Sequence, residues 1–142
     1  MDRKQLQNLA KTRLKDARAL LGRKRWSGAY YLCGYVIECA LKACLLRHLG
    51  ESTAVFSEEN KNRKVSDYWT HNLVDLVKLA GLEPEFGAAR GANPALDKFW
   101  GQTKEWKETS RYEERTEAEA KALYEAVSHE PDRVFRWIRE HW

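Results

Sequence analysis

The chain has 142 residues, of which 43% are hydrophobic and 32% are charged, and its formal net charge is +4 at pH 7. This length suits a single hydrophobic core, and we expect residues 1–142 to form one domain. Three prolines, eight glycines and six tryptophans exclude a disordered, collagen-like or low-complexity chain.

The first predicted element is an amphipathic helix from Asp2 to Leu21. Its apolar residues recur at helical spacing, with lysines and arginines between them. Gly22 and the cations that follow are typical of a helix C-terminus. Residues 1–25 hold nine Lys or Arg and two Asp, a net charge of +7. Such a helix can meet phosphate groups or can simply be a solvated face.

The second predicted element is a helix from Trp26 to Leu49, closed by Gly50. Its run from Trp26 to Leu46 is apolar on every side yet contains Glu38 and Lys42, four residues apart. A helix that is apolar all round belongs inside other elements, where an ionisable pair is costly unless it is paired or used. The run is also about as long as a membrane span, but both charges are expensive in hydrocarbon. We therefore expect a buried helix and no membrane association.

The three cysteines, Cys33, Cys39 and Cys44, all lie in this apolar run. An odd number without framework spacing favours free thiols in a reducing compartment, and no Cys-x-x-Cys pair suggests a metal site. Residues 1–25 contain no apolar segment typical of a secretory signal. We expect a cytoplasmic protein without a metal or another cofactor.

Beyond Gly50, residues 51–66 are polar and aperiodic, which predicts an exposed loop. A short helix is predicted over 71–80, and residues 84–93 are expected to be irregular. Pro94 is suited to the first turn of a further helix, with Asn93 as its N-cap. The apolar residues assigned to that helix are Leu96, Phe99, Trp100 and Trp106.

The last region begins with a capping box at Thr116 and Glu119 and is interrupted by Pro131. Ser128 is a candidate N-cap for a closing helix that contains Val134 and Phe135. No strand-like alternation persists anywhere in the sequence. We therefore predict an all-α fold, an up-and-down bundle of four to six helices.

Common catalytic signatures are missing from the sequence. It contains no Gly-rich phosphate loop, no G-x-S-x-G and no H-E-x-x-H. The four histidines are dispersed along the chain. His71 stands at the start of a predicted helix, where it can cap, pack or take part in a site.

Four segments together resemble the HEPN domain family. The basic first helix ends in A-x-x-L-L-G-R, and G-Y-V-I-E-C-A-L-K-A follows at 34–43. The T-H-N-L-V-D-L segment at 70–76 is similar to the family's His-x-Leu-x-x-Leu element. The S-R-Y segment at 110–112 resembles its Arg-Tyr element. The four pieces occur in the family's order over roughly residues 6–128.

The resemblance implies a helical bundle that often dimerises and acts on or near RNA or nucleotides. Some members are metal-independent ribonucleases, often toxins, with an Arg-x(4–6)-His motif. Others bind nucleotides or RNA without catalysis, or accompany a small nucleotidyltransferase. We accordingly expect a homodimer, with a nucleotide, RNA or such an enzyme as partner.

One Arg-x(4–6)-His match exists in this chain, from Arg136 to His141. About one match is expected by chance in a sequence with this composition, so the motif alone is weak. It also lies near the last residues of the sequence, whereas Arg111, at the expected place, has no histidine within reach. Arg136 and His141, or His71 brought near Arg111, remain the candidate catalytic residues.

The candidate ligand-binding residues are Glu38, Lys42, His71, Arg111 and Tyr112. They either line a polar cleft that binds a phosphate or base, or they stabilise the fold. In the second interpretation Glu38 and Lys42 form an i,i+4 pair, and Arg111 bridges to Glu38 in the interior.

Three functions follow as hypotheses. The first is a nucleotide-, RNA- or partner-binding module without robust catalysis. The second is a metal-independent toxin ribonuclease of a toxin–antitoxin or defence system. The third is a structural helical adaptor that meets its partner through tryptophans, namely Trp69, Trp100, Trp106, Trp137 and Trp142.

Overall fold

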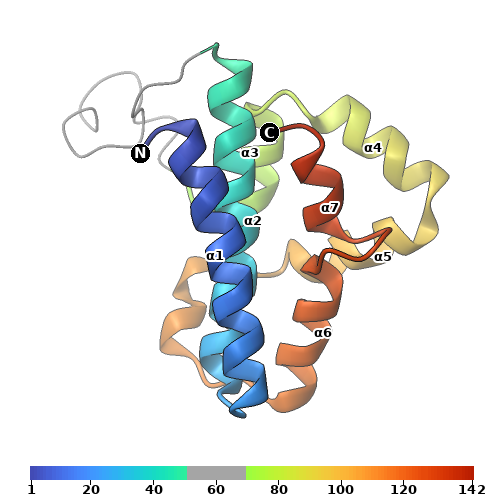
Figure 1. Cartoon of the computed structure of the whole chain (residues 1–142). Coiled ribbons are helices and arrows are strands. Elements are labelled where there is room, and N and C mark those ends of the chain that lie inside the picture. Colours follow the sequence, from blue (N-terminus) through green and yellow to red (C-terminus); the bar gives the residue numbers. More distant parts are fainter. Residues whose placement is uncertain (51–69) are drawn as a thin grey trace.

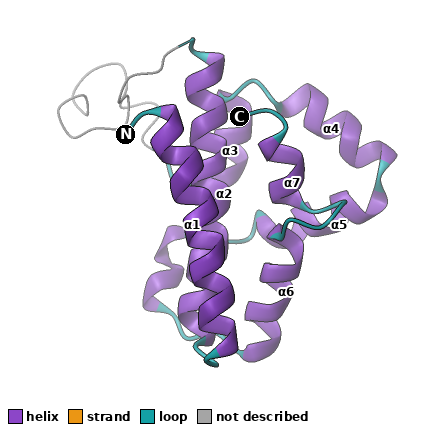
Figure 2. Ribbon diagram, in the orientation of Figure 1, coloured by secondary structure: helices purple, strands orange, loops and turns teal. Residues whose placement is uncertain are grey.

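A computed structural model of the chain describes residues 1–50 and 70–142, and the predicted exposed loop at 51–66 lies outside the described residues. The described residues contain seven α-helices and one 3₁₀ helix, with no strand among them (Figure 2). The predicted all-α class is confirmed, although the helices outnumber the four to six that were expected.

Helices α1 (Arg3–Gly22) and α2 (Trp26–His48) run antiparallel along the length of the molecule (Figure 1). Asp2 caps α1, because its side chain accepts a hydrogen bond from the backbone N–H of Gln5 and the Gln5 side chain returns one. Gly50, whose φ is +69°, lies two residues beyond the end of α2. Both predicted helices are therefore confirmed to within two residues.

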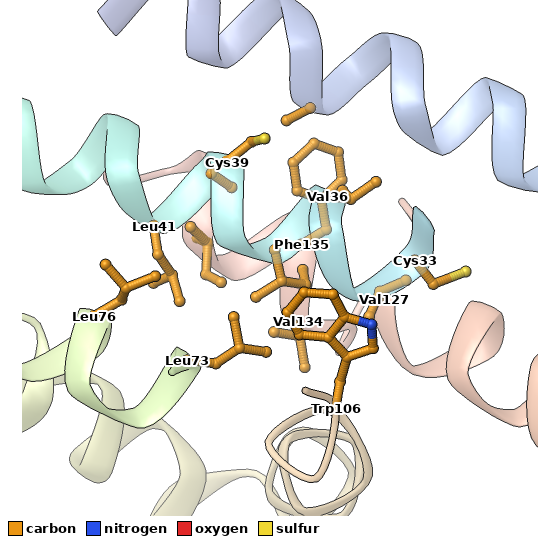
Figure 3. Packing of buried hydrophobic residues seen from close by; sticks show 14 of the residues in the cluster. Cys33, Val36, Cys39, Leu41, Leu73, Leu76, Trp106, Val127, Val134 and Phe135 are labelled. Atoms are coloured by element: carbon orange, nitrogen blue, oxygen red, sulfur yellow. The ribbon is translucent and has the colours of Figure 1, made fainter. Parts of the chain in front are cut away.

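The remaining helices pack against α2 or against one another. They are α3 (Leu73–Leu79), α4 (Glu83–Ala92), α5 (Pro94–Thr103), the 3₁₀ helix η3 (Glu108–Tyr112), α6 (Glu117–Val127) and α7 (Val134–Arg139). Helix α2 contacts α1, α3, η3, α6 and α7. One hydrophobic cluster contains residues from every α-helix, and part of it is drawn in Figure 3.

The position of α2 explains its composition. It is long and apolar enough to pass a length-and-composition test for a membrane span, yet 83% of its most apolar window is buried within the protein. Surrounding helices thus provide the apolar environment that the helix requires. Cys33, Cys39 and Cys44 are buried free thiols, and burial raises the pKa of each to about 12.

Several local predictions differ from the structure. Residues 84–93 are largely helical, because Pro84 occupies the first turn of α4, where its missing N–H costs no hydrogen bond. Helix α5 ends at Thr103, so Trp106 lies beyond it. Ser128 ends α6 and does not begin α7, since its hydroxyl donates to the carbonyl of Glu125.

Candidate functional site: a pocket between α2 and η3

A pocket lined by aromatic, acidic and basic side chains has a volume of about 460 Å³. Helix α2 provides one wall with Tyr31, Tyr35, Glu38 and Lys42. These residues follow one another at intervals of four, three and four, which places them on a single helical face. We call this cavity the α2–η3 pocket.

The opposite wall comes from segments far away in the sequence. His71 precedes α3, and Glu108 and Arg111 belong to η3. Four of the five predicted ligand-binding residues therefore line one pocket, namely Glu38, Lys42, His71 and Arg111. The fifth, Tyr112, does not line it. This residue is 79% exposed, and the guanidinium of Arg111 lies 5.2 Å from the centre of its ring.

Trp106 fixes η3 against α2. Its indole is buried and lies so close to Gly34 that a Cβ built on that glycine would be 2.1 Å from the ring. Only a residue without a side chain leaves room for this approach. Trp106 points toward α2 in Figure 3 and anchors the chain two residues before η3 begins. The glycine–tryptophan contact thereby places Glu108 and Arg111 across from Glu38.

Polar side chains form a continuous chain across the pocket. Lys42 Nζ donates to Glu38 Oε1 at 2.8 Å, and the same oxygen lies 2.7 Å from His71 Nδ1. His71 Nε2 is 3.2 Å from Glu108 Oε2. The other oxygen of Glu108 accepts from Arg111 Nη2 at 2.7 Å. Basic and acidic side chains thus alternate from the buried end to the exposed end, with His71 in the middle.

This row of polar contacts corrects two sequence predictions. The ion pair of Arg111 is with Glu108 rather than Glu38, because η3 places the acid three residues earlier on the same side. The N-cap of α3 is Asn72, whose side chain accepts from Asp75 N–H. The His71 ring is therefore engaged by two carboxylates and does not cap the helix.

One buried polar atom in the pocket has no partner. Glu38 is only 2% exposed, and its Oε2 makes no hydrogen bond within the part of the chain that the structure describes. An unsatisfied buried carboxylate oxygen costs free energy unless a donor reaches it. This atom is therefore available to accept a hydrogen bond from a bound molecule.

The two tyrosines add an aromatic surface beside these charges. Their ring centroids are 6.1 Å apart with an interplanar angle of 8°. Burial raises the pKa of Tyr31 and of Tyr35, so both hydroxyls stay protonated at neutral pH and can donate hydrogen bonds. Sequence reasoning missed both tyrosines and Glu108, although the spacing of Tyr31 and Tyr35 before Glu38 could have revealed the shared face.

The Arg136–His141 candidate pair is not brought together in one pocket. His141 stacks on Trp137, hydrogen bonds to its carbonyl oxygen and faces Glu85 at 3.2 Å. Arg136 lines different cavities from the one that His141 lines. Four residues separate the two positions, and the two side chains line different cavities.

The described tryptophans do not form an exposed patch. Trp100 and Trp106 are buried, and Trp137 and Trp142 pack partly buried against the core. Trp69 lies outside the described residues. Within the described ranges, the exposed large hydrophobic residues are Met1 and Tyr112. The tryptophans of the described ranges therefore give the adaptor hypothesis no exposed surface.

Comparison with known proteins agrees with the resemblance found in the sequence. The model of the HEPN domain matches residues 4–57. No curated protein and no solved structure gives a significant match. At the level of the family, the match supports a module associated with nucleotides or RNA. The resemblance to the HEPN family is thus confirmed over residues 4–57, which include nearly all of α1 and the whole of α2.

Proposed function

We propose that the α2–η3 pocket binds a nucleotide or a short segment of RNA, without robust catalysis. The observation that carries this proposal is the meeting of an aromatic pair, two cations and an unsatisfied carboxylate oxygen in one cavity. Its volume of about 460 Å³ lies within the range of pockets that hold small ligands.

Tyr31 and Tyr35 suit the base of such a ligand. Unpaired bases commonly stack on aromatic side chains, and each stacking contact contributes about 1–3 kcal/mol. Oε2 of Glu38 adds an acceptor for a base amino group or a ribose hydroxyl.

Arg111 suits the phosphate. Its side chain is 46% exposed, and its ion pair with Glu108 uses one of five guanidinium donors. The remaining donors can form charge-assisted hydrogen bonds to phosphate oxygens at the mouth of the pocket.

Binding is favoured over cleavage because His71, the histidine that could transfer a proton, already contacts two carboxylates. Both ring nitrogens of His71 face carboxylates, at 2.7 Å and 3.2 Å. A histidine in this setting must break one of these contacts before it can accept or deliver a proton to a substrate.

Isothermal titration with AMP and with a short single-stranded RNA tests the proposal. Arg111→Gln removes the phosphate contact and is expected to weaken binding about tenfold, the usual size for one charge-assisted hydrogen bond. Arg23→Gln makes the same charge change on an exposed residue outside this pocket and should alter binding less than about twofold. Equal losses in the two variants, or no binding at low salt, would contradict the proposal.

A ribonuclease remains the second candidate, because His71 and Arg111 both contact Glu108. In this alternative His71 moves a proton and Arg111 stabilises the charge of the phosphorane. RNA cleavage that persists with EDTA and disappears in His71→Ala would favour it. Induced expression should then also arrest growth, with relief in the same variant. His141→Ala serves as the matched control, since His141 lies outside the pocket.

A further inference from the structure

A second group of basic side chains lies on α7 and at the end of α6, away from the α2–η3 pocket. His129, Arg136, Arg139 and Glu140 line a cavity of about 600 Å³. Helix α7 and η3 lie on different sides of the α1–α2 pair (Figure 1). We call this cavity the α6–α7 pocket.

The hydrogen bond between Arg139 and His129 determines the tautomer of the imidazole. Arg139 Nη1 is 3.1 Å from His129 Nδ1. A guanidinium can only donate, so Nδ1 must accept, and the proton of the neutral ring is on Nε2. Desolvation lowers the pKa of His129, and the charges of Arg139 and Arg136 lower it further. The ring therefore offers one N–H donor beside two permanent cations.

Positive charge is in excess around this cavity. Lys11 of α1 adds a cation, and its Nζ lies 5.4 Å from the centre of the Trp142 ring. The guanidinium of Arg139 lies 5.5 Å from the centre of the same ring. Glu140 is the carboxylate that lines the cavity, and Glu130 acts on His129 from nearby. Within the described ranges, no ion pair joins Lys11, Arg136 or Arg139 to a carboxylate.

We propose that Arg136, Arg139 and His129 form a second site, which binds a phosphate group. Two planar guanidinium groups match the oxygens of a phosphate, and the imidazole N–H supplies a third donor. A bound phosphate would also reduce the repulsion between the like charges that line the cavity. The site is independent of the α2–η3 pocket, because it shares no residue with it.

NMR titration of the full-length chain tests this site. The imidazole signals of His129 are followed while inorganic phosphate is added at pH 7. We expect a saturable shift, and Arg136→Gln should weaken the apparent affinity about tenfold. Arg23→Gln is the matched control, since it removes the same charge from an exposed residue at the C-terminal end of α1, outside this cavity. The control should change the affinity less than about twofold.

A short 5′-phosphorylated RNA added in parallel identifies the source of the phosphate. Saturation at lower concentration than with inorganic phosphate assigns the site to nucleic acid, whereas the reverse order assigns it to a free phosphate. The absence of a saturable shift with both ligands would overturn the proposal, as would equal weakening in Arg136→Gln and Arg23→Gln. Arg111→Gln should leave these titrations unchanged, which separates this site from the proposed nucleotide pocket.

Discussion

His71 stands between two carboxylates, one from the buried α2 and one from the partly exposed η3. Glu38 Oε1 is 2.7 Å from one ring nitrogen, and Glu108 Oε2 is 3.2 Å from the other. The ring thereby joins segments that are separated by more than thirty residues on either side. Its side chain is 42% exposed, so a ligand that enters the pocket can reach it.

Two ion pairs of this pocket differ in whether they could be predicted from the sequence. The i,i+4 spacing of Glu38 and Lys42 predicted their ion pair, and the structure confirms it. The partner of Arg111 could not be deduced, because it depends on the short 3₁₀ helix that presents Glu108 beside it. Local spacing determines contacts within one helix, whereas contacts between elements depend on how the elements pack.

His129 makes stability depend on pH in a defined direction. Its pKa is lowered in the folded chain by desolvation and by Arg139 and Arg136. A depressed pKa means that the unfolded chain binds the proton more readily, so this residue favours folding at neutral pH. Its contribution is lost as the pH falls through the ordinary histidine range and below. In His129→Gln, the free energy of unfolding should therefore fall less between pH 7 and pH 5 than in the parent chain. Urea denaturation at each pH measures this difference.

An equal fall in the free energy of unfolding between pH 7 and pH 5 in His129→Gln and the parent chain would contradict this assignment. His48→Gln is a suitable control on another histidine, since His48 lies at the end of α2 away from the two arginines. The comparison isolates His129 from carboxylates that also titrate at acid pH.

At the scale of elements, two helix N-caps were predicted correctly from the sequence. Asn93 and Thr116 cap α5 and α6 as their sequence patterns predicted. Helix α4 was missed, because a single buried residue, Phe86, faces the core and leaves no apolar periodicity to detect. Packing against α5 therefore defines that helix more than its own sequence pattern does.

The contact between Gly34 and Trp106 gives a test of how η3 is held. Gly34→Ala should gain helix propensity, worth up to about 1 kcal/mol. The added methyl would lie 2.1 Å from a buried indole, and such overpacking usually costs about 1–3 kcal/mol. Because the rigid ring is enclosed, the clash should dominate and lower the free energy of unfolding, measured by chemical denaturation.

Gly101→Ala in α5 is the matched control, since a Cβ there meets no atom within 4 Å. It should leave stability unchanged or raise it slightly. A stabilised Gly34→Ala variant would show that Trp106 is free to move and that η3 is not fixed by this contact.

At the scale of the whole molecule, the apolar α2 acts as the common core of the bundle. Its length suggested a membrane span, whereas its contacts with five other elements account for the same apolarity. The face that bears Tyr31, Tyr35, Glu38 and Lys42 is the exception, because it opens into a pocket. Dimerisation and a nucleotidyltransferase partner remain predictions of the family resemblance. A cytoplasmic location remains a prediction from the cysteines and from residues 1–25.

Photo-crosslinking tests the central claim, nucleotide binding in the α2–η3 pocket, most directly. A short RNA that contains 4-thiouridine is irradiated with the full-length chain, and the modified peptide is mapped by mass spectrometry. If the base stacks on the aromatic wall of the pocket, the crosslink should fall on Tyr31 or Tyr35 and be lost on competition with unmodified RNA. Crosslinks confined to other segments, with none on α2, would contradict the account.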